Sequence, residues 1–149
     1  ELSEERRGYA GDSARNLLAG AELEAGASSC QAPELDAAAA VDGTYCRGWQ
    51  ARPDDAAPWW KLRLKQAANA ETLLFTRLHN RARDRAATRP IALRLLIDGE
   101  VVAERLELDP DPQRKTRFVL PRRQRVREIE IHFLDAAGPA VGIAEVELQ

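Results

Sequence analysis

The basic segment between residues 79 and 89 is the part of the sequence best suited to binding chemistry. It supplies five candidate ligand-binding residues: His79, Asn80, Arg81, Arg83 and Arg89. An arginine presents a planar fork of N–H donors that fits carboxylates, sulfates, phosphates and vicinal hydroxyls. The segment therefore suits an anionic or polyhydroxylated ligand. The alternative is a solvated charged loop in which Asp84 pairs with an arginine.

Four aromatic residues could present a flat face to a ligand. Trp60 lies on the same strand face as Leu62 and Leu64, which predicts that it is a core residue. Trp49 is expected to be a core plug, filling the interior rather than offering its face to a sugar. Trp59 is out of phase with that apolar face, so we expect it to be exposed. Aromatic faces pack against the C–H groups of sugar rings. Trp59 and Tyr45 are therefore candidate ligand contacts.

Residues typical of catalysis are not grouped in this sequence. The serines lie in early loops far from both histidines, which does not suit a nucleophilic triad. The carboxylate pairs Asp54–Asp55 and Asp109/Asp111 stand in proline-containing turns without apolar surroundings that would raise a pKa. Phosphate-loop and dinucleotide motifs are also absent. We predict that the protein is not an enzyme.

Composition narrows the range of partners. The chain of 149 residues carries a net charge of −2 and 31% charged residues, which argues against nucleic acid as a partner. No apolar run is long enough to span a membrane. The polar residues 1–15 are expected to be a flexible tail or linker, and residues 16–149 to be one domain, monomeric in itself.

The two cysteines, Cys30 and Cys46, stand sixteen positions apart in loop-like stretches. A metal site is disfavoured because His79 and His132 have no ligand spacing to them. A disulfide is the preferred interpretation, and it would place the protein in an extracytoplasmic, oxidising compartment. Two separate thiols in a cytosolic protein are the alternative.

Short strands separated by turns dominate the chain after about residue 58. Polar and apolar residues alternate with a period of two over 60–65 and 126–133, and Asp98-Gly99 between two apolar runs predicts a hairpin. Further strands are expected at 71–79, 90–98, 101–108, 115–120 and 141–148, with one near 21–25. The pattern predicts an all-β, antiparallel sandwich or jelly roll.

Five segments, taken in order, resemble the discoidin or coagulation-factor C-type domains, which are also called galactose-binding-like. They are Asn16–Ala19, Ala40–Gly43 followed by Trp49, Trp59–Leu62, Arg89-Pro90 up to Asp98-Gly99, and Gly142–Leu148. The spacing from Asn80 to Asp98-Gly99 is also similar to a bacterial glycan-binding variant. The resemblance implies an eight-stranded antiparallel jelly-roll β-sandwich with a ligand site in the loops at one end.

The resemblance also implies a structural calcium ion, with Asp42 and Glu145 at matching ligand positions. However, Thr44 stands where a second acidic or amide residue is usual, and Arg47 would place a positive charge beside the ion. We therefore expect no cofactor, and calcium at Asp42 and Glu145 stays an alternative. A Cys30–Cys46 disulfide could fix the same loop instead.

These observations favour a non-catalytic carbohydrate-binding module of a larger secreted or surface protein. Its expected ligand contacts are Tyr45, Arg47, Trp59, His79, Asn80, Arg81, Arg83 and Arg89. The arginines favour an acidic glycan over a neutral one. The alternative is a structural or protein-interaction domain that binds no sugar, which the low aromatic content of 5% would suit.

Overall fold

The computed structural model of the chain describes residues 16–43, 48–78, 91–111, 114–134 and 141–149. The predicted tail, residues 1–15, lies outside this part. The strands are β1 (Leu23–Ala27), β2 (Trp49–Gln50), β3 (Trp59–Arg77), β4 (Ala92–Ile97), β5 (Glu100–Glu107), β6 (Thr116–Leu134) and β7 (Gly142–Leu148). Two short 3₁₀ turns, Pro33–Leu35 and Ala37–Val41, stand between β1 and β2. None of the described helices is long and apolar enough to cross a membrane.

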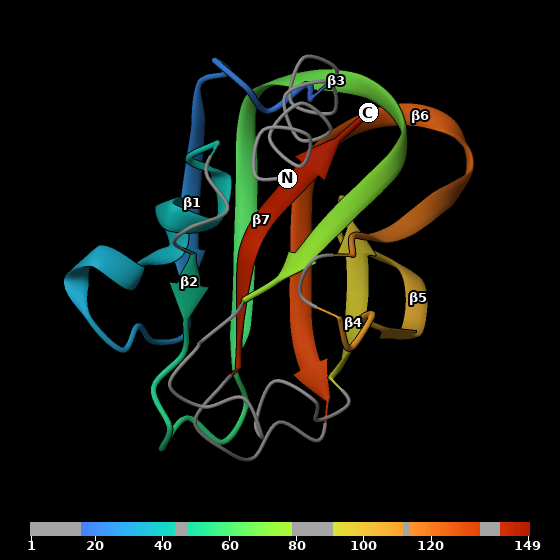
Figure 1. The fold of residues 1–149 in the computed structure, drawn as a ribbon. Coiled ribbons are helices and arrows are strands. Elements are labelled where there is room, and N and C mark those ends of the chain that lie inside the picture. The colour runs from blue at the N-terminus through green and yellow to red at the C-terminus, as the bar shows by residue number, and fades with distance from the viewer. Residues whose placement is uncertain (1–15, 44–47, 79–90, 112–113, 135–140) are drawn as a thin grey trace, which may run out of the picture.

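All strand pairs are antiparallel, and two long strands join the two layers of a sandwich. In one layer, the first half of β3 pairs with the second half of β6. β1 pairs with β3 on one side of this pair, and β4, followed by β5, pairs with β6 on the other side. The second half of β3 pairs with β7 and with the start of β6, and β2 pairs with β7. Figure 1 shows both long strands curling over as they pass between the layers. The predicted all-β jelly-roll sandwich is confirmed.

The long strands differ from the sequence prediction, which divided each of them in two. The register between β3 and β6 shifts between Arg63 and Ala68 and again between Ala70 and Thr72. Pro121 lies at the second shift. The strand pairing is irregular there, so the missing N–H of proline breaks no regular hydrogen bond between the strands. The chain therefore turns the corner of the sandwich without ending either strand.

The core lies between the two layers and follows the predicted alternation. Trp60, Leu62 and Leu64 are at most 2% exposed, whereas the residues between them face outward. Trp49 is also fully buried, as expected for a core plug, and its ring lies 5.7 Å from that of Phe133. Each indole keeps a hydrogen-bond partner: Trp49 Nε1 donates to the Ser29 carbonyl and Trp60 Nε1 to the Ala37 carbonyl. Burial of these large rings supplies much of the driving force for folding.

The hairpin predicted at Asp98-Gly99 is present between β4 and β5. Ile97 pairs with Glu100, and both turn residues have positive φ, 50° and 84°. The side chain of Asp98 also accepts hydrogen bonds from the backbone N–H groups of Arg127 and Glu128, at 2.9 and 2.7 Å. The turn is therefore tied to the neighbouring strand β6.

Candidate functional site

Several chain segments begin and end together at one end of the sandwich, the lower end in Figure 1. At that end Ala92 pairs with Leu134. The Ala51 N–H donates to the Val141 carbonyl at 2.9 Å, and the Phe133 N–H donates to the Pro58 carbonyl at 3.0 Å. The chain ends that bound 79–90 and 135–140 are thus brought beside the loop between β2 and β3. This is the end at which the sequence places the basic segment.

Seven of the eight predicted ligand contacts lie outside the described residues. They are Tyr45, Arg47, His79, Asn80, Arg81, Arg83 and Arg89. Their positions as ligand contacts remain predictions. Trp59 is the eighth, and its surroundings can be described.

Trp59 opens β3 at this end of the sandwich, and it is partly exposed. Neighbouring residues of a strand point to opposite faces. Because Trp60 lies in the core, the indole of Trp59 lies on the outer face of the sheet, where it borders a shallow hollow together with Lys61 and Gly26. Its partner in the register is His132 on β6. The predicted exposure of Trp59 is therefore confirmed in part.

The backbone of Trp59 is held by a polar network that the sequence did not suggest. The Ser28 N–H donates to the Trp59 carbonyl, and the Trp59 N–H donates to Ser28 Oγ, both at 3.0 Å. The hydroxyls of Ser28 and Ser29 both donate to Asp55 Oδ2, at 2.5 and 2.6 Å. Partial burial opposes ionisation of Asp55, but these two hydroxyls and the Ala57 N–H together lower its pKa. An ionised Asp55 thus anchors the strand that presents Trp59.

Of the two residues proposed as calcium ligands, Asp42 lies near enough to Glu145 for its charge to act on that carboxyl group. The Gly43 N–H donates to Glu145 Oε1 at 3.2 Å, and the other oxygen, Oε2, is buried without a hydrogen-bond partner among the described residues. Burial raises the pKa of Glu145 to about 9, and the nearby negative charge of Asp42 adds to the rise. A buried carboxyl of this kind needs either a proton or a cation. The pair offers oxygen donors and negative charge, but no group of three or more His, Cys, Asp or Glu side chains that could hold a metal ion occurs among the described residues. Thr44 and Arg47 lie outside that part of the chain.

Glu145 and Glu147 alternate with Val146 and Leu148 in the sequence, a pattern typical of one polar and one apolar strand face. Each is nevertheless only 1% exposed, and the turn Ala37–Val41 packs against β7. Lys115 Nζ lies 2.8 Å from Glu147 Oε2 and balances its charge. The Lys115 side chain is itself only 11% exposed, so this ion pair belongs to the interior of the domain.

The predicted disulfide is not present. Cys30 is an exposed, free cysteine, and Cys46 lies outside the described residues. The loop that holds Cys30 is fixed by other contacts, since Gln31 N–H donates to the Gln50 carbonyl at 2.8 Å. Because no disulfide is present, the cysteines give no support for an oxidising compartment.

Two glycines allow β2 and β7 to approach closely beside this end of the sandwich. A Cβ on Gly48 would overlap the carbonyl oxygen of Ile143 and the Cα of Ala144. A Cβ on Gly142 would overlap the carbonyl oxygen of Trp49. Neither glycine was singled out from the sequence, because a close approach between distant segments leaves no local pattern.

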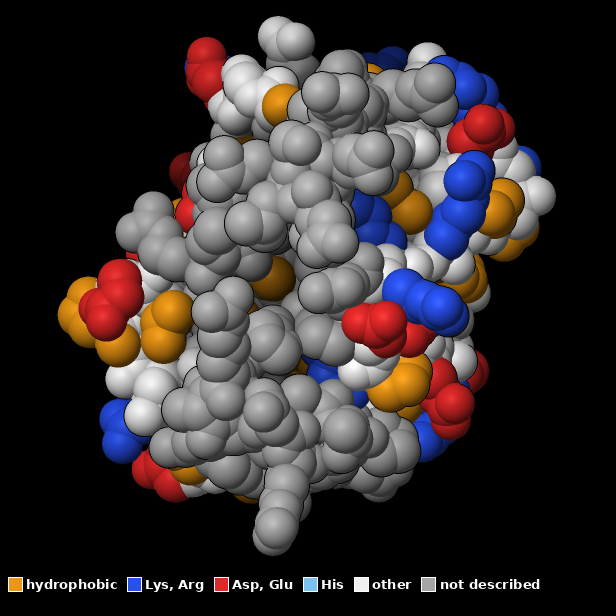
Figure 2. Space-filling model, in the orientation of Figure 1, with side chains coloured by type: hydrophobic (Ala, Val, Ile, Leu, Met, Phe, Trp, Pro, Cys, Tyr) orange, Lys and Arg blue, Asp and Glu red, His pale blue; other side chains and the backbone are white. Residues whose placement is uncertain are grey.

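Charged side chains on the visible face of the molecule are mixed in sign. Figure 2 shows Lys and Arg side chains next to Asp and Glu side chains over β4 to β6, at the right of the view. Arg94 lies 3.3 Å from Glu104, and Arg105 lies 3.5 Å from Glu107. The described charges over β4 to β6 therefore form no uniform positive patch.

Comparison with known proteins adds solved structures with the same architecture. No protein-family model matches the chain, and no curated protein matches it significantly. A pectin-binding carbohydrate-binding module superposes with a TM-score of 0.68 at 17% identity, covering 87% of this chain and 91% of the module. The family 32 carbohydrate-binding module of C. perfringens NanJ, in complex with galactose, gives a TM-score of 0.66 at 17% identity, with coverages of 85% and 92%.

The fold is that of the discoidin, galactose-binding-like domains. The F5/8 type C domain of a Bacteroides fragilis protein supports this, with a TM-score of 0.65 at 16% identity over 85% of this chain and 89% of that domain. The predicted resemblance is thereby confirmed at the level of the fold. The similar structures named here are carbohydrate-binding modules and a type C domain rather than catalytic domains.

Proposed function

We propose that the protein is a non-catalytic carbohydrate-binding module of a larger secreted or surface protein. The observation that carries this proposal is the placement of Trp59, a partly exposed indole with a fixed backbone, at the end of the sandwich where several loops begin. The fold is shared with modules described as binding galactose or pectin. A flat aromatic face beside hydrogen-bonding loops is the usual composition of a sugar site.

The proposed site combines Trp59 with the basic segment. Arg81, Arg83 and Arg89 would supply paired N–H donors to carboxylates or vicinal hydroxyls of the ligand, and His79 and Asn80 would add single hydrogen bonds. Tyr45 and Arg47, in the segment between Gly43 and Gly48, would complete the contact surface. An acidic glycan suits this set, and the similarity to a pectin-binding module agrees with such a ligand. We expect modest affinity, because a shallow site buries little area.

No cofactor takes part in this proposal as a reacting group. Asp42 and Glu145 would hold a calcium ion if the module uses one, and the ion would supply a fixed positive charge at the base of the segment that carries Tyr45 and Arg47. Its role would be to order that segment, which would present the two side chains to a glycan.

A glycan-array experiment tests the proposal. The purified protein is screened with and without calcium, at low and high salt, against arrays containing uronate-, sialate- and sulfate-bearing glycans. We expect binding that weakens as salt rises, because arginine–carboxylate contacts are screened. Arg83→Ala should remove this binding and leave the melting temperature unchanged, with Arg105→Ala, which lies on β5, as the matched control.

A blank array from well-folded protein would contradict the proposal. In that case the second function, a structural or protein-docking domain, becomes the better one. The low aromatic content of 5% is the observation that favours it.

A further inference from the structure

Three shallow hollows lie in a row over the outer faces of the paired strands β1 and β3 and together form a groove that begins at Trp59. A hollow of about 300 Å³ beside Trp59 shares Glu24 and Arg63 with a second hollow of about 480 Å³. The second shares Lys65 with a third of about 420 Å³, which reaches Ala68. At about 3.3 Å per strand residue, the path from Trp59 to Ala68 measures roughly 30 Å. The groove is therefore long enough for several sugar rings in a row.

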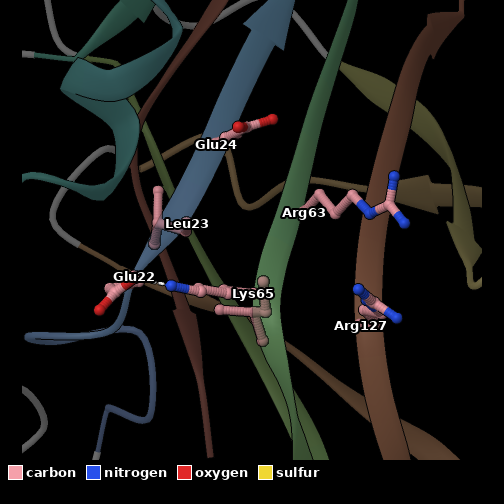
Figure 3. Close-up of a pocket in the computed structure, with 7 residues that line it drawn as sticks. Glu22, Leu23, Glu24, Arg63, Lys65 and Arg127 are labelled. Carbon is pink, nitrogen blue, oxygen red and sulfur yellow. Dashed lines mark ion pairs between the residues drawn. The ribbon is translucent and has the colours of Figure 1, made fainter.

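Charged side chains from three strands form the walls of the middle hollow. Figure 3 shows Glu24 on β1 with Glu22 just before that strand, Lys65 and Arg63 on β3, and Arg127 on β6, with the Arg63 side chain reaching toward β6. Lys65 Nζ lies 2.9 Å from Glu22 Oε2, where the second hollow meets the third, so a ligand that runs through both must displace this exposed ion pair. The hollows thus offer both hydrogen-bond donors and acceptors.

Gly26 keeps the floor of the groove open next to Trp59. It pairs with Lys61 in the register, and a Cβ built on Gly26 would meet no atom within 4 Å. A strand interior is an unfavourable place for glycine, and one there often marks a close approach by a ligand or another backbone. A ring stacked on Trp59 would find the adjacent position free of side chains.

The charges in the groove largely balance each other. Lys61 Nζ lies 3.7 Å from Glu128 Oε1 and 3.8 Å from Glu130 Oε1, and Arg63 Nε lies 4.0 Å from Glu128 Oε1. A polyanion would gain little here, because each of these cations already has a carboxylate beside it. Hydroxyl groups both donate and accept hydrogen bonds, so an uncharged polyhydroxylated chain fits both kinds of group.

We propose that this groove binds an extended, uncharged polysaccharide chain. Trp59 would stack on one sugar ring, and the side chains of Arg63, Lys65, Glu22 and Glu24 would hydrogen-bond the hydroxyls of the following rings. The inference rests on the proposed glycan-binding function, since Trp59 borders both surfaces. It extends that function, because the groove would take internal units of a chain whereas the loops at the end would take an acidic group.

The test uses a substitution that fills the groove without touching the end loops. Gly26→Glu places a carboxylate opposite Lys61, a favourable cross-strand pair, and blocks the floor. Gly26→Ala is the matched control, because a methyl group leaves the groove open. Arg63→Gln is a second groove variant that changes a wall residue with an exposed side chain. Calorimetry then measures the Kd of neutral β-linked glucose, galactose and xylose oligomers, from mono- to hexasaccharide.

We expect the Kd of the unmodified protein to fall by about tenfold or more from mono- to hexasaccharide in one of the three series. Gly26→Glu should abolish this dependence on length, Arg63→Gln should reduce it, and Gly26→Ala should preserve it, all at an unchanged melting temperature. Affinity that does not depend on length overturns the groove, as does a length dependence that survives Gly26→Glu but is lost in Arg83→Ala. Absence of binding to every glycan, acidic or neutral, overturns the proposed function as well.

Discussion

Ser28 and Trp59 are joined by two hydrogen bonds of 3.0 Å each: the Ser28 N–H donates to the Trp59 carbonyl, and the Trp59 N–H donates to Ser28 Oγ. The pair links the end of β1 to the start of β3. Ser28 Oγ also donates to Asp55, so the contact reaches the loop between β2 and β3. Because the backbone N–H and carbonyl of Trp59 are both held, the residue would lose less conformational entropy when a ligand binds. A rigid aromatic at this position is therefore better suited to a ligand than to the core.

Trp59→Ala should separate binding from folding. We expect glycan affinity to fall by about tenfold or more, because a stacking face is lost, while the melting temperature changes little. Trp60→Ala is the contrasting variant: Trp60 is fully buried, and its loss should cost about 3–5 kcal/mol of stability. Thermal unfolding and calorimetric titration of both variants check this. Unfolding of Trp59→Ala would show that the indole is structural.

Ser28→Ala should loosen the platform without removing it. The variant loses the hydroxyl that accepts from the Trp59 N–H and donates to Asp55, at a cost of about 1 kcal/mol. The pKa of Asp55 is lowered in the folded state, so its contribution is present above the ordinary value of 3.8 and is lost as pH falls through the folded-state pKa. Acid titration followed by fluorescence should therefore show unfolding of Ser28→Ala at a higher pH than unfolding of the unmodified protein. Identical acid transitions would contradict the network.

The sequence was sufficient for features that depend on neighbours in the chain. The period of two at Trp60, Leu62 and Leu64 identified a core face because adjacent strand residues must point to opposite sides. The Asp98-Gly99 hairpin followed from the positive φ angles that its turn requires. Both features are local, so a single sequence contains the information that determines them.

Features that depend on distant segments could not be predicted in the same way. Glu145 alternates with apolar residues like a surface side chain, but it is buried, and its hydrogen bond comes from Gly43, 102 positions earlier. The contacts of Asp55 with Ser28 and Ser29 span 27 and 26 positions. The strand predicted at 115–120 stops before Pro121, since only the partner strand reveals the irregular register that accommodates this proline. The groove beside Trp59 needed the positions of β1, β3 and β6 together.

Gly48→Ala should destabilise the domain, whereas Gly26→Ala should not. A methyl group at Gly48 overlaps the backbone of Ile143 and Ala144, which cannot move without breaking the pairing of β2 with β7. We expect a loss of about 1–3 kcal/mol, as for other overpacked sites. Gly26 has open space around its Cα, so alanine there is neutral or slightly stabilising. Urea titrations of the two variants measure the difference, and equal midpoints would show that the close approach of β2 and β7 is not required.

Glu145→Gln should change how stability depends on pH. Burial raises the folded-state pKa of Glu145 to about 9 from its ordinary 4.5, with Asp42 and Glu147 adding to the rise and Gly43 and Lys115 opposing it. A raised carboxyl pKa contributes stability that is fully present below 4.5 and is lost as pH increases through 9. The unmodified protein should therefore lose melting temperature between pH 5 and 9 more steeply than Glu145→Gln, whose amide does not titrate.

Calcium should reverse this dependence if Asp42 and Glu145 bind it. A cation needs the ionised carboxylate, so millimolar calcium should raise the melting temperature of the unmodified protein, and the increase should be larger at pH 8 than at pH 6. Glu145→Gln should show no such increase, and magnesium serves as the control because its strict octahedral geometry suits the site less well. A melting temperature that is insensitive to calcium at both pH values would show that a proton, and not a cation, neutralises Glu145.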